Sequence, residues 1–96
     1  MPKAYWISAY HAIHDEQKLV TYAKLALPAI TASGGRFLAR GVAVKAYEAG
    51  KLQRTVIIEF ESLEKALACH DSPAYQAALA ALGDGATRDL RVVEGV

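Results

Sequence analysis

The centre of the chain is the segment RFLARGVAVKAYEAGKLQRTVIIEFE, residues 36–61. We predict one strand over residues 36–47 and another over 54–61, where aromatic and β-branched side chains recur. Residues 48–51, Glu-Ala-Gly-Lys, are typical of a turn. Because the connection is short, the two strands are expected to pair as an antiparallel hairpin.

A helical pattern precedes the hairpin. Asp15 offers an N-cap side chain, and Gly34-Gly35 ends the pattern where the chain is expected to turn left-handed. Between them an apolar face recurs at helical spacing and comprises Leu19, Tyr22, Ala23, Ala26, Ala29 and Ile30. Pro28 lies inside this pattern, and because it lacks a backbone donor we expect a kink near residues 24–25.

A second helical pattern follows the hairpin. Ser62 is a candidate N-cap, and Ser72-Pro73 combines a serine cap with proline at the first helical position, so the helix is expected to break and restart there. Gly83-Asp84-Gly85 ends the pattern. The first and last strands are predicted over residues 4–12 and 88–94.

The predicted order is therefore β-α-β-β-α-β within one domain, residues 1–96. Right-handed crossovers fold this order into an α+β, ferredoxin-like structure, a four-stranded antiparallel sheet with both helices on one face. The other face is expected to carry Arg40, Val42, Val44, Ile57 and Glu59. Because that face is too apolar to be left in water, we predict a homodimer in which two sheets meet face to face.

Composition narrows the class of protein. The charges nearly balance, with 11 basic and 10 acidic residues, and no basic run or stripe predicts a nucleic-acid partner. No apolar stretch approaches the ~20 residues of a membrane span, and no signal peptide is visible before Tyr5. Cys69 is the single cysteine, which excludes an intrachain disulfide and favours a reducing cytoplasm.

Five segments in order over nearly the whole chain carry a resemblance: Tyr5-Trp6-Ile7, GGRFLARG at 34–41, Ile58-Glu59-Phe60, SPAYQ at 72–76 and Val93-Glu94-Gly95. In these segments the chain resembles the small bacterial family catalogued as domain of unknown function 1330, in the dimeric α/β-barrel superfamily. The resemblance implies that two protomers pack sheet to sheet into a barrel with the helices outside. Similar proteins often carry an arginine near the position of Leu82 and a larger aromatic residue near Cys69-His70, and this chain does not. The family's function is unknown, so the resemblance implies no reaction.

Arg40 and Glu59 are the first candidate ligand-binding residues. Hairpin geometry around Gly50 predicts that they lie on the same sheet face, opposite each other or nearly so. An arginine on a covered sheet face suits a carboxylate ligand. The alternative is an internal or cross-dimer ion pair that fixes the strand register.

Tyr10, Tyr22 and Tyr75 are further ligand-binding candidates. Together with Tyr5 and Trp6 they make the domain rich in aromatic side chains for its size, as suits a pocket for a planar small molecule. Packing in the core and in the dimer interface explains the same residues equally well.

His11 and His70 are candidate catalytic bases, because imidazole titrates near neutral pH. His11 lies at a predicted strand end and His70 at the helix break, while His14 is expected to be solvated. A histidine taken alone is more often structural. No metal site is predicted, because no HxH or HxxxH spacing occurs and a metal needs three or four convergent ligands. No cofactor is predicted either.

Two functions remain open at this point. One is a dimeric module that binds a small anionic or aromatic molecule between sheet and helices. The other is a cofactor-free, oxygenase- or isomerase-like enzyme with His11 or His70 as base and Arg40 holding an anionic substrate. A cleft that holds histidine, arginine and tyrosine together would favour the enzyme. A filled interior with Arg40 paired to Glu59 would favour the module.

Overall fold

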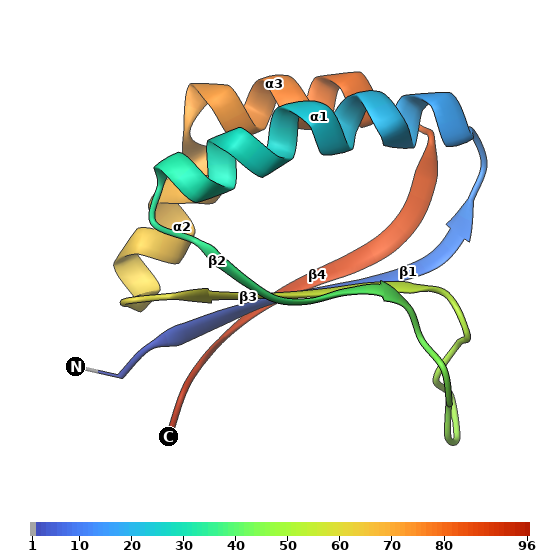
Figure 1. Cartoon of the computed structure of the whole chain (residues 1–96), viewed down its shortest axis with the longest axis horizontal. Helices are drawn as coiled ribbons and strands as arrows, with labels where there is room; N and C mark the ends of the chain where they lie inside the picture. Colours follow the sequence, from blue (N-terminus) through green and yellow to red (C-terminus); the bar gives the residue numbers. More distant parts are fainter. Residues whose placement is uncertain (1) are drawn as a thin grey trace.

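The structure is a computed structural model and describes residues 2–96. Its elements follow the predicted order, with the second helix divided in two (Figure 1). They are β1 (Ala4–Ile13), α1 (Glu16–Ala32), β2 (Arg36–Val42), β3 (Arg54–Phe60), α2 (Leu63–Asp71), α3 (Pro73–Leu82) and β4 (Ala86–Glu94).

The four strands form one antiparallel sheet in the order β2-β3-β1-β4. The helices lie on one side of this sheet, and its other face is uncovered (Figure 1). The predicted α+β, ferredoxin-like fold is therefore confirmed. Because successive side chains of a strand point to opposite faces, β1 presents Trp6, Ser8 and Tyr10 to the helices and Ile7 and Ala9 to the uncovered face.

The core lies between the sheet and the helices, and Trp6 is near its centre. The Trp6 side chain is 1% exposed, stacks on Phe60 with ring centroids 5.9 Å apart, and meets the ring edge of Tyr75 at 4.9 Å. Aromatic pairs in such geometries contribute about 0.5–1.5 kcal/mol beyond the burial of their area. The ring of Tyr75 is thus held in place by the core, which fixes the position of its hydroxyl.

Helix α1 begins and ends as predicted. The Asp15 carboxylate accepts hydrogen bonds from the backbone N–H groups of Gln17 and Lys18, at 3.0 and 3.1 Å. Gly34 has a φ of +89°, the left-handed conformation that glycine adopts without steric cost. The helix continues through Pro28 as one element. Among residues 2–96, no helix is long and apolar enough to cross a membrane.

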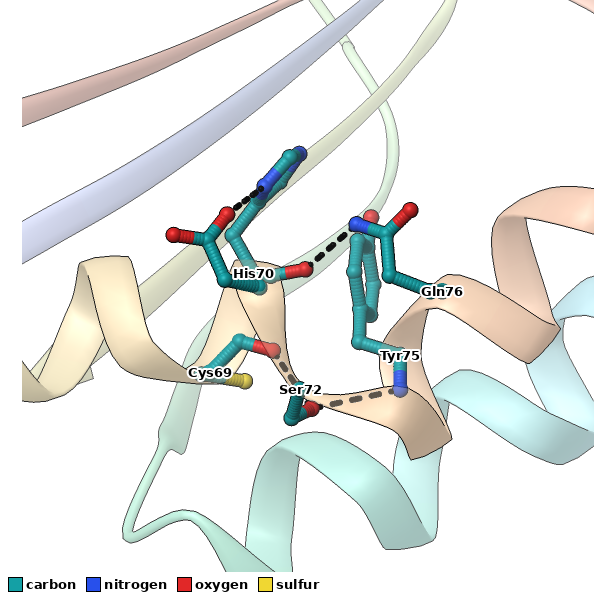
Figure 2. A network of polar contacts seen from close by, with 6 residues as sticks. Cys69, His70, Ser72, Tyr75 and Gln76 are labelled. Atoms are coloured by element: carbon teal, nitrogen blue, oxygen red, sulfur yellow. Dashed lines mark hydrogen bonds and ion pairs between the residues drawn. The ribbon is translucent and has the colours of Figure 1, made fainter.

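The predicted break between the two halves of the second helix lies at Ser72 (Figure 2). The Ser72 hydroxyl donates to the Cys69 carbonyl at 2.7 Å and accepts from the Tyr75 N–H at 3.3 Å, so one side chain ends α2 and caps α3. The Gln76 side chain adds a hydrogen bond to the His70 carbonyl at 2.7 Å. These contacts set the direction in which α3, and with it Tyr75, leaves the break.

The hairpin is shorter than predicted, because β2 ends at Val42 and not at residue 47. Beyond that point Ala43 N–H still donates to the Gln53 carbonyl, but residues 44–52 leave the sheet as an arm closed by a turn at 47–50. Val44, which was expected on the uncovered face, lies in this arm and is 96% exposed.

A bulge in β2 reverses the faces of its second half. The pairing of β2 with β3 shifts by one residue at Leu38. An extra residue in a strand moves every following side chain to the opposite face. Arg40 is consequently aligned with Val56, which is buried under the helices, whereas Glu59 lies on the uncovered side. The prediction that Arg40 and Glu59 share a face is wrong for this reason.

Candidate functional site

Four elements bring polar side chains together between the sheet and the helices. We define the Arg88 cluster as Arg88 of β4, Ser8 and Tyr10 of β1, Tyr22 of α1 and Tyr75 of α3. Nη1 of Arg88 donates to Ser8 Oγ and to the hydroxyls of Tyr10 and Tyr22, and Nη2 donates to the hydroxyl of Tyr75, each at 3.2 Å.

Strand register and helix capping place these side chains. Arg88 is aligned with Tyr10 across the β1–β4 pair, and both side chains lie on the helix side of the sheet. Tyr22 belongs to the buried face of α1. Tyr75 lies in the first turn of α3, directly after the Ser72 cap, and its ring points away from the helix backbone (Figure 2).

The hydroxyls of Tyr10 and Tyr75 remain protonated at neutral pH. Burial raises the pKa of Tyr75 and that of Tyr10, and in both cases it outweighs the nearby charge of Arg88. A hydroxyl that accepts from Arg88 therefore keeps its own proton and is able to donate it. The oxygens of Tyr22 and Tyr75 are 2.7 Å apart, so one of these two donates to the other.

The Arg88 guanidinium has no carboxylate partner among residues 2–96. Its guanidinium lies over aromatic rings, 4.8 Å from the centroid of Tyr22 and 5.3 Å from that of Tyr10. Among residues 2–96, the ion pairs within 4.0 Å do not include Arg88. Because arginine stays protonated at physiological pH, the cluster holds a cation that no acid neutralises.

A cavity of about 30 Å³ adjoins the cluster, between α1 and the sheet. All members of the cluster except Tyr75 line it, together with Arg40 and Arg54. The Nε atom of Arg54 is buried and has no hydrogen-bond partner in the part of the chain that the structure describes, residues 2–96. Arg40 is exposed and lies 5.1 Å from the ring centroid of Phe37. Three arginines thus surround one small cavity whose lining contains no acidic side chain.

Four of the five predicted ligand-binding residues lie at or beside this cavity. Tyr10, Tyr22 and Arg40 line it, and Tyr75 joins it through hydrogen bonds to Tyr22 and Arg88. The structure therefore brings these four side chains together.

Glu59 is the exception. Its carboxylate accepts a hydrogen bond from the Tyr5 hydroxyl at 3.2 Å and pairs with Lys3 Nζ at 3.5 Å, on the uncovered face of the sheet. The internal pair between Arg40 and Glu59, one of the alternatives considered, is therefore wrong, and Arg40 has no acid partner within 4.0 Å among residues 2–96.

Neither candidate base lines the arginine-rich cavity. His11 lies where the β1–β4 register is irregular, with Nε2 2.8 Å from Asp89 Oδ2, and lines a separate hollow of about 250 Å³ with Lys51. Asp89 also accepts from Arg91 Nε at 3.2 Å. Because both carboxylate oxygens of Asp89 are used, this pair resembles a surface ion-pair network more than a buried catalytic dyad.

His70 lies at the helix break, where Nδ1 is 3.1 Å from Asp71 Oδ1 (Figure 2). Its ring packs 5.8 Å from Trp6 and 5.5 Å from Tyr75, measured between centroids, so it covers the core at this end. Within residues 2–96, no three histidine, cysteine or acidic side chains converge as a metal site would require.

Arg88, Arg54 and Ser8 were not predicted as site residues. A signal for Arg88 does exist in the sequence, because it shares its alternation in β4 with Leu90 and Val92, which pack on the core. An arginine at an inward position of a half-buried strand is unusual and indicates a special environment. Arg54 stands two residues before the buried Val56 and carries the same signal.

Comparison with known proteins identifies the family. The model of the domain of unknown function DUF1330 matches residues 3–96, which include every helix and strand. No curated protein matches the chain.

Solved structures share the fold at low sequence identity. A protein of unknown function from Rhodopseudomonas palustris has a TM-score of 0.78 and 11% identity, over 99% of this chain and 83% of its own. SnoaB, a cofactor-independent oxygenase from Streptomyces nogalater, has a TM-score of 0.68 and 10% identity, over 100% of this chain and 95% of its own. A dimeric ferredoxin-like protein of unknown function from Thermobifida fusca has a TM-score of 0.64 and 22% identity, over 99% of this chain and 91% of its own.

Proposed function

The chain belongs to the DUF1330 family, and from this premise we propose that it is a homodimeric α/β-barrel protein that binds a small anionic molecule between its sheet and α1. The observation that carries the proposal is the charge of the cavity. Arg88, Arg54 and Arg40 meet there, and the lining contains no aspartate or glutamate.

The hydrogen bonds of Arg88 support an anionic rather than a cationic or neutral ligand. Each hydroxyl of the cluster accepts a hydrogen bond from Arg88, so its own proton remains available to donate. One of these protons is used in the hydrogen bond between Tyr22 and Tyr75. The Nε–H of Arg54 is a further donor without an acceptor. Buried polar groups in native proteins are nearly always hydrogen-bonded, so an excess of donors indicates that the missing acceptors come from a bound molecule.

The uncovered sheet face supports the homodimer. It carries Ile7 and Ile57 at its centre, directly opposite each other on β1 and β3. A second sheet placed on this face would bury those side chains and leave the cavity, which lies on the helix side, open to a ligand. The dimeric relative from Thermobifida fusca has the same fold.

The enzymatic alternative required a histidine and an arginine in one cleft. The fold is shared with SnoaB, a cofactor-independent oxygenase, which is consistent with that alternative. However, neither His11 nor His70 lines the arginine-rich cavity. The separation favours a binding role for the cavity over base-catalysed chemistry within it.

Thermal denaturation in the presence of small anions tests the proposal. We expect at least one of acetate, benzoate, phosphate and sulfate, each added separately to protein in a buffer without other small anions, to raise the melting temperature. The substitution Arg88→Met should remove this shift. Arg91→Met, an exposed arginine on the other face of the same strand, should keep it. The proposal is wrong if no anion stabilises the protein, or if Arg88→Met responds as the wild type does.

A further inference from the structure

We infer that the ligand of this cavity is a small monocarboxylic acid with an apolar tail. This inference rests on the proposed anion site and adds the chemical class of its occupant. It depends on three features of the cavity: its hydrogen-bond donors, its volume, and the apolar side chains of its lining.

The donors suit the two oxygens of a carboxylate. Ser8 and Tyr10 both accept from Nη1 of Arg88 and both line the cavity, so their hydroxyl protons are available for an acceptor placed there. Arg54 also lines the cavity, and its buried Nε–H makes no hydrogen bond to residues 2–96. A carboxylate accepts about four hydrogen bonds and donates none, whereas an amide of the same shape would turn an NH₂ group toward these donors.

The volume limits the head group. A single water needs roughly 10–15 Å³ of such space, so the cavity of about 30 Å³ has room for two or three atoms of that size. The two oxygens of a planar carboxylate fill this space. A phosphate carries four oxygens in a tetrahedron and would need the side chains around Arg88 to move apart.

Apolar side chains make up much of the remaining lining: Ala23, Ala26 and Leu27 of α1, and Phe37 and Val56 of the sheet. Leu27 and Arg40 are exposed, so the lining reaches the surface there. Because a carboxylate already fills the cavity, an aliphatic or aromatic tail would extend past these exposed side chains while its carboxylate stays at Arg88, in the manner of pockets that combine apolar walls with a few polar anchors.

The experiment compares ligands that differ in one property at a time, by calorimetric titration and melting temperature of the whole chain. Benzoate and butyrate are expected to bind, and acetate, which has the head group but almost no tail, at least tenfold more weakly. Benzamide, the neutral isostere of benzoate, and inorganic phosphate should produce no shift.

Variants test which side chains of the cavity bind the carboxylate and which bind the tail. Arg88→Met should weaken benzoate at least tenfold, and Arg91→Met should not. If Arg88→Met does not fold, Arg54→Met takes its place, because the Nε of Arg54 has no hydrogen bond to lose. Ala23→Leu should weaken benzoate and butyrate more than acetate, since Ala23 belongs to the apolar lining along which the tail is expected to lie.

The possible failures are distinct. Binding of phosphate or sulfate without any carboxylate would overturn the inference and leave the anion site standing. Equal binding of acetate and benzoate would show that the apolar wall is not used, and would also overturn it. Equal binding of benzamide and benzoate, or no binding of any anion, would overturn both the inference and the proposed function.

Discussion

The hydroxyl of Tyr75 joins the Arg88 cluster to α3. Its ring is fully buried, and its oxygen lies 2.7 Å from that of Tyr22 and 3.2 Å from Nη2 of Arg88. Tyr75→Phe keeps the ring and removes both hydrogen bonds, one of them to a charged group, so we expect the free energy of unfolding to fall by about 1–3 kcal/mol. Urea denaturation measures this. Tyr47→Phe, at a position that is 75% exposed, is the control and should change nothing; equal midpoints for the two variants would contradict the predicted role.

The side chain of Asp89 makes the free energy of unfolding depend on pH in the acidic range. Its hydrogen bond from His11, together with the nearby charge of Arg91, holds the pKa of Asp89 below its ordinary value. A carboxylate whose pKa is lowered by folding stabilises the folded state at neutral pH, and this contribution is lost as the pH falls from about 4 through the lower pKa of the folded state. Asp89→Asn should therefore have a lower melting temperature than the wild type at pH 6, and the difference should shrink at pH 3.

Melting curves of wild type, Asp89→Asn and His11→Ala between pH 3 and pH 6 test this dependence. His11→Ala removes the strongest of the contacts on Asp89, so it should reproduce most of the effect. A difference between wild type and Asp89→Asn that is constant over this pH range would rule the ion-pair network out as its source.

At the scale of the elements, Ser72 holds the junction of α2 and α3. Its hydroxyl both donates to Cys69 and accepts from the Tyr75 N–H, whereas Ser62, the cap of α2, accepts only from Lys65 N–H. We expect Ser72→Ala to lower the free energy of unfolding by roughly 1 kcal/mol, and by more than Ser62→Ala does. Denaturant titration of the two variants checks the order. Equal losses would mean that the hydrogen bond to Cys69 contributes nothing.

Local sequence rules predicted these junctions correctly, because each depends on residues that are neighbours in the chain. Asp15 and Ser72 cap helices through side chains that bond N–H groups two or three residues away. Gly34 ends α1 because a single residue there must be left-handed. The bulge at Leu38 is different, since it exists only in the pairing of β2 with β3. No residue pattern within β2 predicted it, and Arg40 was assigned to the wrong face as a result.

At the scale of the whole molecule, the candidate site combines what was predictable with what was not. The tyrosines were singled out by residue type, but their meeting depends on packing between elements. Tyr10 and Tyr75 are 65 positions apart in the sequence and reach the same guanidinium. The overall charge balance gives no sign of Arg88, whose signal in the sequence is its inward position in the alternation of β4. The three arginines are separated in sequence and become one site only in the folded sheet.

At the same scale the fold predicts a homodimer, because no element among residues 2–96 covers the sheet face opposite the helices. Ile57 lies on it, aligned with Ile7 on one side and Ala39 on the other. Sedimentation equilibrium at low micromolar concentration should give twice the 10.3 kDa of one chain. Ile57→Lys should shift the mass toward the monomer, because a charge buried in an apolar interface is costly. Val20→Lys, on the exposed side of α1, should not. A folded wild-type monomer of 10.3 kDa would contradict the dimer.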